Sequence, residues 1–87
     1  MYVIAVYDIN SLRVAKMLKL FRQYLHWIQN SVFEGELSEG KLNELKDKAT
    51  ELMNPDEDSI IFFTSRSKKW LEKEIIGLEK NSGTTIL

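Results

Sequence analysis

The sequence predicts a small α+β domain in which strands and helices alternate. Three observations support this: two short, continuously apolar segments typical of buried strands, two segments with helical spacing of apolar residues, and a mixed segment between those helices. In chain order they give strand, helix, broken strand, helix, strand, which is the βαββαβ order of the ferredoxin-like class. We expect residues 1–87 to form one domain of this class, with an extra strand at the C-terminal end.

The first strand and the first helix have the clearest patterns. Residues 2–7 are an unbroken run of mainly β-branched and aromatic side chains, followed by turn-forming residues at 8–11. Apolar side chains then recur at helical spacing to residue 25, with Asn10 or Ser11 as the expected N-cap. These apolar positions are Val14, Met17, Leu18, Phe21 and Leu25.

The middle of the chain is less regular. Residues 27–37 fit two short strands or one broken strand, with a turn or bulge at Asn30-Ser31 or at Gly35. Ser38 is expected to cap a second helix that Asn54-Pro55 ends. The apolar positions of this helix are Leu42, Leu45, Ala49, Leu52 and Met53.

The last third contains a second apolar strand at residues 58–64, followed by a tail of mixed character. Residues 66–80 fit either a short helix or an irregular turn, and residues 84–87 fit a strand. Residues 3–6 and 60–63 are apolar on both faces of their strands, although the two helices of this fold cover only one face. We therefore expect a homodimer in which a second copy covers the other face, with residues 78–87 pairing across the boundary.

Composition excludes several kinds of site. The chain has no cysteine, which excludes disulfides, thiolate nucleophiles and cysteine zinc sites, and His26 is its only histidine. No apolar stretch approaches the roughly 20 residues that cross a bilayer, and residues 1–8 lack the features of a signal peptide. We therefore expect a cytoplasmic protein with no membrane contact.

The strongest candidate for chemistry is Asp8, at the C-terminal end of the first strand. A strand fixes the position of such a carboxylate, which suits a metal ligand or a general base, and two copies facing each other would suit Mg²⁺. The alternative is that Asp8 caps the first helix or closes an Asx turn. Glu34 and Glu36, on one face of a strand, form a second carboxylate pair, for which a solvated surface is the simpler interpretation.

Positive charge is segregated even though the formal net charge is only -1. No acidic residue occurs between positions 11 and 25, so the first helix has a basic side. We expect this side to contact the backbone of duplex nucleic acid, with an ordinary solvated surface as the alternative. The basic residues are Arg13, Lys16, Lys19 and Arg22 on the helix, and Arg66, Lys68 and Lys69 after the last internal strand.

Four motifs occur in a specific order and spacing along the chain. They are Tyr7-Asp8-Ile9, Arg13-Val14, Gln29-Asn30-Ser31-Val32-Phe33-Glu34-Gly35 and Glu74-Ile75-Ile76-Gly77. Together they resemble, nearly end to end, the CRISPR-associated protein 2 family, the small partner of the CRISPR integrase. One departure is Trp27, where some relatives have an arginine before the Ile-Gln pair.

The resemblance implies a ferredoxin-like homodimer that acts in spacer acquisition, bridges two dimers of the CRISPR-associated integrase and helps to hold duplex DNA. Family members have also been assigned Mg²⁺-dependent endonuclease activity on single-stranded RNA or double-stranded DNA. Residue by residue, the resemblance makes Asp8 the Mg²⁺ ligand, with Tyr7 beside it in the catalytic position. Arg13 is then the helix arginine, and the family's Ser-Val-Phe motif falls on Ser31, Val32 and Phe33.

Two hypotheses of different classes follow. In the structural hypothesis the dimer is a rigid spacer whose basic helices touch phosphate, and Asp8 is dispensable. In the enzymatic hypothesis two copies of Asp8 hold Mg²⁺, which activates water and stabilises charge on the scissile phosphate. One carboxylate per chain is a sparse ligand set, so the structural hypothesis is preferred as the main role.

Overall fold

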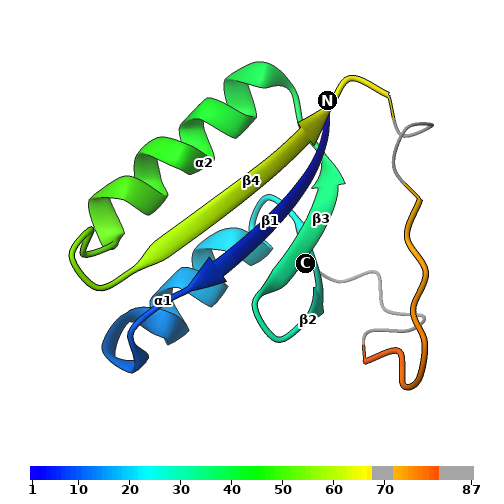
Figure 1. Cartoon of the computed structure of the whole chain (residues 1–87). Helices are drawn as coiled ribbons and strands as arrows, with labels where there is room; N and C mark the ends of the chain where they lie inside the picture. Colours follow the sequence, from blue (N-terminus) through cyan, green and yellow to red (C-terminus); the bar gives the residue numbers. More distant parts are fainter. Residues whose placement is uncertain (68–71, 81–87) are drawn as a thin grey trace.

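The computed structural model describes residues 1–67 and 72–80, and within them the elements follow the expected order (Figure 1). They are β1 (Tyr2–Asp8), α1 (Ser11–Arg22), β2 (His26–Gln29), β3 (Val32–Glu36), α2 (Glu39–Leu52) and β4 (Ser59–Ser65). The strands form one sheet in the order β2-β3-β1-β4, and every neighbouring pair is antiparallel. This is the strand order of the ferredoxin-like class, so the predicted fold is confirmed.

The core lies between the sheet and the two helices. Side chains alternate along β1, and Val3, Ala5 and Tyr7 are buried on the helix side. Phe21 of α1 and Phe33 of β3 pack against Tyr7, with ring centroids 5.2 and 5.4 Å from that of Tyr7. The other fully buried core residues come mainly from the apolar stripes of the helices: Met17, Leu25, Leu42, Leu45 and Ala49.

The start of α1 agrees with prediction, but its end differs. Asn10 is the N-cap, because its side-chain oxygen accepts a hydrogen bond from the amide of Leu12 at 2.9 Å. The helix ends at Arg22 and not at residue 25. The amides of Tyr24 and Leu25 both donate to the carbonyl of Phe21, which closes the last turn before β2 begins.

The mixed middle segment forms two strands joined at Asn30 and Ser31. Asn30 has a φ of 43°, in the left-handed region that asparagine tolerates better than most residues. Gly35, the other candidate for a turn, lies inside β3. A Cβ atom at Gly35 would come within 3.2 Å of Leu25 Cδ2, so the glycine allows the close approach of Leu25.

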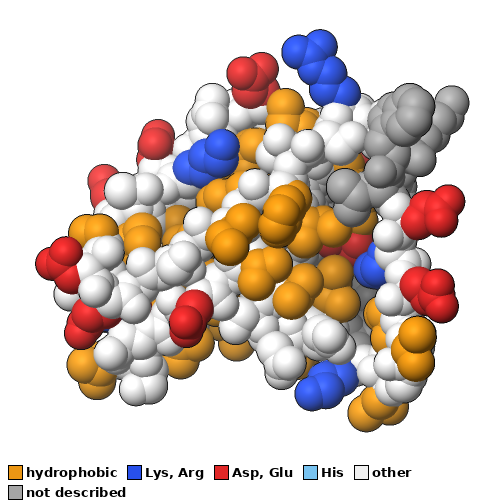
Figure 2. All heavy atoms as spheres, viewed as in Figure 1, with side chains coloured by type: hydrophobic (Ala, Val, Ile, Leu, Met, Phe, Trp, Pro, Cys, Tyr) orange, Lys and Arg blue, Asp and Glu red, His pale blue; other side chains and the backbone are white. Residues whose placement is uncertain are grey.

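The face of the sheet opposite the helices, here called the open face, is apolar at its centre. It carries Ile4 and Val6 of β1, which lie opposite Phe63 and Ile61 of β4. Ile61 and Phe63 are 51% and 52% exposed. Figure 2 shows hydrophobic side chains gathered across the middle of this face. The prediction that both strands are apolar on both faces is confirmed.

Beyond β4 the described residues have no regular secondary structure. Of the two alternatives left open for residues 66–80, a short helix or an irregular turn, the described residues 72–80 are irregular, while residues 68–71 lie outside the described residues. Lys73 of this segment donates to the carboxylate of Glu34 on β3. The strand expected at residues 84–87 lies outside the described residues, and the dimer-pairing segment 78–87 is described only as far as residue 80. No helix in the described part of the chain is long and apolar enough to cross a membrane.

Candidate metal and nucleic-acid sites

Asp8 is the last residue of β1 and lies directly opposite Ser59 of β4. Because side chains alternate along a strand, the exposed Asp8 shares the open face with Val6 and Ile4. Asn10, and not Asp8, provides the cap of α1. The part of the alternative interpretation in which Asp8 caps the first helix is therefore wrong.

The backbone is held by hydrogen bonds on both sides of Asp8. The amide of Tyr7 donates to the carbonyl of Ser31 at 3.1 Å, which ties the end of β1 to the β2–β3 turn. The amide of Asn10 donates to the carboxylate of Asp58 at 2.8 Å. Asp8 thus lies on a segment fixed to β3 on one side and to the start of β4 on the other.

The chemistry of Asp8 fits a hard cation as one ligand among several. A carboxylate oxygen is a ligand that Mg²⁺ takes, usually with waters and phosphate oxygens completing the shell. Among residues 1–67 and 72–80, no group of three or more His, Asp or Glu residues is placed to hold an ion. Asp8 is thus one ligand of an incomplete set within the described residues, which a second copy, water or a phosphate group would complete.

Tyr7 points away from Asp8. Its side chain lies on the helix side of the sheet, is 5% exposed, and meets Phe21 edge to face. Burial raises the pKa of the Tyr7 hydroxyl above its ordinary value. The structure does not bring Tyr7 and Asp8 together on one face, although they are adjacent in the sequence.

Arg13 is held by two carboxylates of its own chain. Its Nε lies 2.6 Å from Asp58 Oδ2, and its Nη2 lies 2.8 Å from Glu57 Oε1 and 3.1 Å from Asp58 Oδ1. The hydrogen bonds from Arg13 hold the pKa of Asp58 well below its usual range, and the backbone amides of Asn10 and Asn54 act in the same direction. The Arg13 side chain is only 20% exposed.

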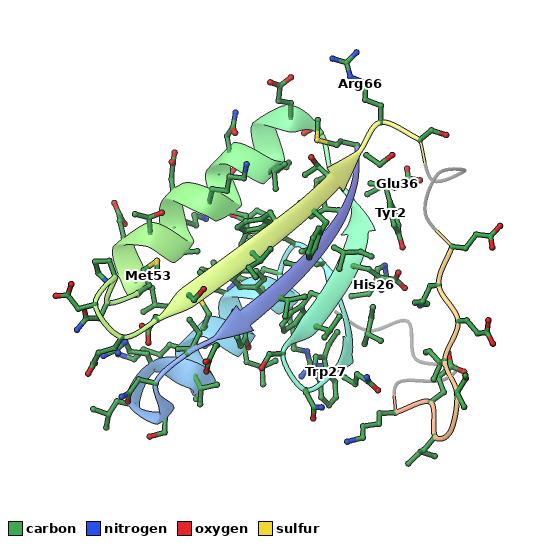
Figure 3. All side chains as sticks on the ribbon, in the orientation of Figure 1. Tyr2, His26, Trp27, Glu36, Met53 and Arg66 are labelled. Atoms are coloured by element: carbon green, nitrogen blue, oxygen red, sulfur yellow. The ribbon has the colours of Figure 1, made fainter. Side chains whose placement is uncertain are left out.

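The other predicted basic residues of α1 are more accessible. Lys16 and Lys19 are exposed and Arg22 is half-buried. Arg66, just after β4, is also exposed and is labelled in Figure 3. Lys68 and Lys69 lie outside the described residues. The structure therefore separates Arg13, whose guanidinium is engaged, from the lysines that present free charge to a partner.

The Ser-Val-Phe motif has a structural place. The carbonyl of Ser31 accepts from Tyr7, Val32 pairs with Val6, and Phe33 is completely buried in the aromatic cluster. These three residues therefore anchor the end of β1 that carries Asp8. Each of them contributes through packing or backbone pairing.

The sequence suggested a solvated surface for Glu34, but the structure gives its carboxylate hydrogen-bond partners. Its carboxylate accepts hydrogen bonds from the hydroxyl of Tyr2 and from Lys73. Burial, together with this bond to Glu34, raises the pKa of Tyr2 to about 12. Glu36, opposite Tyr2 at the end of β3, is exposed (Figure 3).

A cavity of about 280 Å³ lies at the edge of the sheet formed by β2, and Asp8 does not line it. His26 and Trp27 of the edge strand β2, both labelled in Figure 3, form part of its wall. The remaining lining residues are Ile28, Glu34, Lys73, Ile75 and Glu79.

Asp58 is the functional candidate that sequence reasoning missed. It is the one buried charged residue in the described part of the chain, at 7% exposure. In the sequence it reads as one of several acids after Asn54-Pro55. The only available signal was an acidic residue placed directly before an apolar strand.

Comparison with known proteins gives consistent results. A family model described as "CRISPR associated protein Cas2" matches residues 1–73. A CRISPR-associated endoribonuclease Cas2 from Dictyoglomus turgidum is 49% identical over 87 residues and covers 100% of both chains. One from Thermotoga maritima is 52% identical over 80 residues, which is 92% of each chain.

Solved structures agree with these matches. A crystal structure titled as that of Cas2 has a TM-score of 0.87 and 40% identity, covering 100% of this chain and 98% of the other. The crystal structure of Streptococcus pyogenes Cas2 at pH 6.5 has a TM-score of 0.71 and 27% identity, covering 85% and 99%.

Proposed function

The chain belongs to the Cas2 family of CRISPR-associated proteins, and from this premise we propose that it is a subunit of the spacer-acquisition machinery. In this proposal it forms a homodimer, bridges copies of the CRISPR-associated integrase and contacts duplex DNA.

The exposed basic side of α1 is the observation that carries the proposal. Lys16 and Lys19 are exposed, and Arg22 follows on the same helix. No acidic residue lies between positions 11 and 25 to neutralise them. A helix with such a side neutralises backbone phosphates without reading sequence, which suits a protein that must accept many different DNA segments. A homodimer doubles this basic surface.

The homodimer itself is supported by the open face. A sheet face that remains in contact with water usually carries polar side chains between its apolar ones. Here Ile61 and Phe63 are half-exposed beside Ile4 and Val6. If the open face of a second protomer packs against this one around a two-fold axis, the apolar surface of both is removed from water.

A second candidate function is an endonuclease that depends on Mg²⁺. The exposed carboxylate of Asp8 at the end of β1 favours it, as do the names of relatives, which are called endoribonucleases. Mg²⁺ bound there would supply charge stabilisation at a phosphate and a more acidic water. Asp8 would provide one ligand per protomer, and single-stranded RNA or double-stranded DNA is the substrate.

Substitution of Asp8 by asparagine separates the two functions. Asp8→Asn removes the charge and keeps the shape of the side chain, so the dimer should persist. We expect spacer integration to continue and metal-dependent cleavage of RNA or DNA to be lost. Both assays use the same preparation, and light scattering confirms the dimer.

Two results would contradict these proposals. Loss of integration in a variant that still dimerises contradicts a purely structural role for the chain in acquisition. Cleavage that is unaffected by Asp8→Asn and needs no metal shows a contaminating nuclease and removes the second function.

A further inference from the structure

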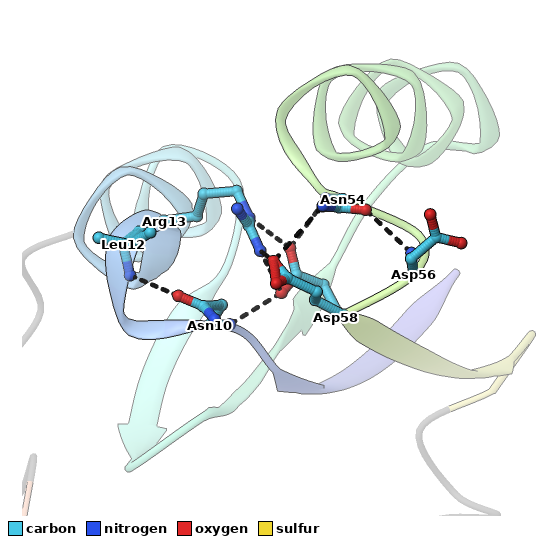
Figure 4. Close-up of polar contacts among 7 residues, drawn as sticks. Asn10, Leu12, Arg13, Asn54, Asp56 and Asp58 are labelled. Atoms are coloured by element: carbon cyan, nitrogen blue, oxygen red, sulfur yellow. Dashed lines mark hydrogen bonds and ion pairs between the residues drawn. The ribbon is translucent and has the colours of Figure 1, made fainter.

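The carboxylate of Asp58 receives four hydrogen bonds from two separate segments, the first turn of α1 and the end of α2. Arg13 donates through Nε at 2.6 Å and through Nη2 at 3.1 Å. The amide of Asn10 donates at 2.8 Å, and the amide of Asn54 donates at 2.9 Å. Figure 4 shows Asp58 between the first turn of α1 and the end of α2, with these donors around it.

The burial of this carboxylate makes the arrangement specific. The Asp58 side chain is 0% exposed, and a buried charge is costly unless donors surround it. Its donors are two backbone amides and a guanidinium, and a guanidinium can bind both carboxylate oxygens in a fixed plane. Displacement of either donor segment leaves the charge underpaired, so the first turn of α1, the end of α2 and the start of β4 are held together.

One of these segments carries Asp8. Asn10, whose amide is bound by Asp58, is two residues after Asp8, and Ser59, which follows Asp58, pairs with Asp8 across the sheet. On the other side the amide of Tyr7 is bound to Ser31. The short stretch from residue 8 to residue 10 is therefore anchored at both ends, and its Asp58 anchor depends on Arg13.

We propose that Asp58 and Arg13 are positioning residues for Asp8, which hold its carboxylate on the open face in the orientation that a divalent cation requires. This inference rests on the Mg²⁺-ligand role proposed for Asp8 in the second candidate function. A ligand must be held rigidly by residues that are themselves fixed, because a loose ligand spends binding energy on becoming ordered. The pair with Asp58 also gives Arg13 a role other than direct contact with phosphate.

The test measures cation binding and not cleavage. Mn²⁺ serves as the probe, because it broadens the NMR signals of nearby amides. We would titrate ¹⁵N-labelled full-length protein with Mn²⁺ and follow the amides of Asp8, Ile9 and Ser59. All measurements are made at a temperature at which circular dichroism shows each variant to be folded.

Substitutions at the positioning residues should weaken Mn²⁺ binding. We expect Asp58→Asn and Arg13→Gln each to weaken it by about 10-fold to 100-fold, the usual effect of losing a residue that orients a metal ligand. Arg13→Lys keeps the charge and should recover part of the affinity. The double variant should be no weaker than the stronger single variant, because the two residues act as one unit.

Matched controls separate positioning from stability. Leu45→Ala removes a buried core contact on α2, about two turns before the end of that helix. It should destabilise the fold and leave Mn²⁺ binding unchanged. A Leu45→Ala variant with equally weakened binding, or a folded Asp58→Asn variant with the affinity of the unmodified protein, overturns the proposal.

The Asp8→Asn variant distinguishes failure of the proposed ligand role of Asp8 from failure of the positioning role of Asp58 and Arg13. If Asp8→Asn binds Mn²⁺ as the unmodified protein does, the proposed role of Asp8 as a ligand fails, and the positioning role fails with it. If Asp8→Asn abolishes binding while Asp58→Asn does not change it, only the positioning role fails.

Discussion

Ile4 of β1 and Phe63 of β4 lie directly opposite each other on the open face, where neither helix reaches them. Side chains opposite each other in an antiparallel ladder are in contact distance, so the pair forms part of one apolar surface. Phe63 remains 52% exposed. A monomer would keep this surface in water.

Replacing Phe63 with lysine should weaken the homodimer. Phe63→Lys places a charge at the centre of the open face. We expect the dissociation constant of the dimer to rise at least tenfold, which corresponds to a loss of about 1.4 kcal/mol in the free energy of dimerisation. Light scattering over a dilution series measures the change. Leu12→Lys is the matched control, because Leu12 is 83% exposed on α1, away from the open face. A dimer unaffected by Phe63→Lys would place the interface elsewhere.

The lysines of α1 should determine the salt dependence of DNA binding. Lys16→Gln with Lys19→Gln removes two exposed charges, so the slope of log affinity against log salt should fall by about 1.8 per protomer. Fluorescence anisotropy with duplexes of unrelated sequence measures this slope.

Two variants serve as controls for the slope. Lys41→Gln removes an exposed lysine of α2 and should leave the slope unchanged. Arg13→Gln should also change it little, because Arg13 already binds Asp58 and Glu57. A slope that drops with Arg13→Gln but not with the lysine pair would assign the phosphate contact to Arg13.

Asp58 should contribute to the acid stability of the fold. Its pKa is lower in the folded chain than in the unfolded chain, so its contribution is complete above the ordinary aspartate pKa of about 4 and is lost as the pH falls further. Asp58→Asn should therefore lower the melting temperature near pH 7 and flatten the decline below pH 4. Melting curves between pH 2.5 and pH 7 test this. Parallel declines in both proteins would show that Asp58 is not the responsible group.

Phe33 should be important for stability and not for chemistry. It is completely buried against Tyr7 and Phe21. Phe33→Ala should reduce the free energy of unfolding by about 3–5 kcal/mol, and Phe33→Leu should cost less because it leaves a smaller cavity. Urea denaturation measures both. If a folded Phe33→Leu variant lost as much DNA binding as Phe33→Ala, Phe33 would instead have a direct functional role.

The turn between β2 and β3 should depend on the backbone freedom of residue 30. Asn30 has a positive φ, so Asn30→Gly should be nearly neutral. Asn30→Val should cost about 1–2 kcal/mol, because β-branched residues are strained in that region. Urea denaturation compares the two variants, and equal stability would show that the turn relaxes.

The fold could be predicted because its signals are local. Residues 2–7 and 60–63 are short apolar runs rich in β-branched and aromatic residues, which favours strands, and the stripe from Val14 to Phe21 repeats at helical spacing. The end of α1 was predicted three residues too late, because Leu25 continues the apolar spacing even though it is buried beyond the helix. Burial and helicity are separate properties that one periodicity cannot distinguish.

The candidate site was only half predictable. Asp8 follows from its position at the end of a strand, but the partner of Arg13 does not. Arg13 and Asp58 are 45 residues apart, and their pairing depends on where β4 begins beside β1. Charge counting along α1 therefore grouped Arg13 with Lys16 and Lys19, although only the lysines are exposed.

The position of β1 in the centre of the sheet has a consequence for biosynthesis. β1 is synthesised before β3 and β4, the two strands with which it pairs, and Tyr2 pairs with Ser65 of β4. Such distant pairings give a high contact order, and folding is slower than in a helical protein of similar size. Until β4 has been synthesised, the apolar residues of β1 lack one of their two neighbouring strands, and this interval is when the nascent chain is most prone to aggregate.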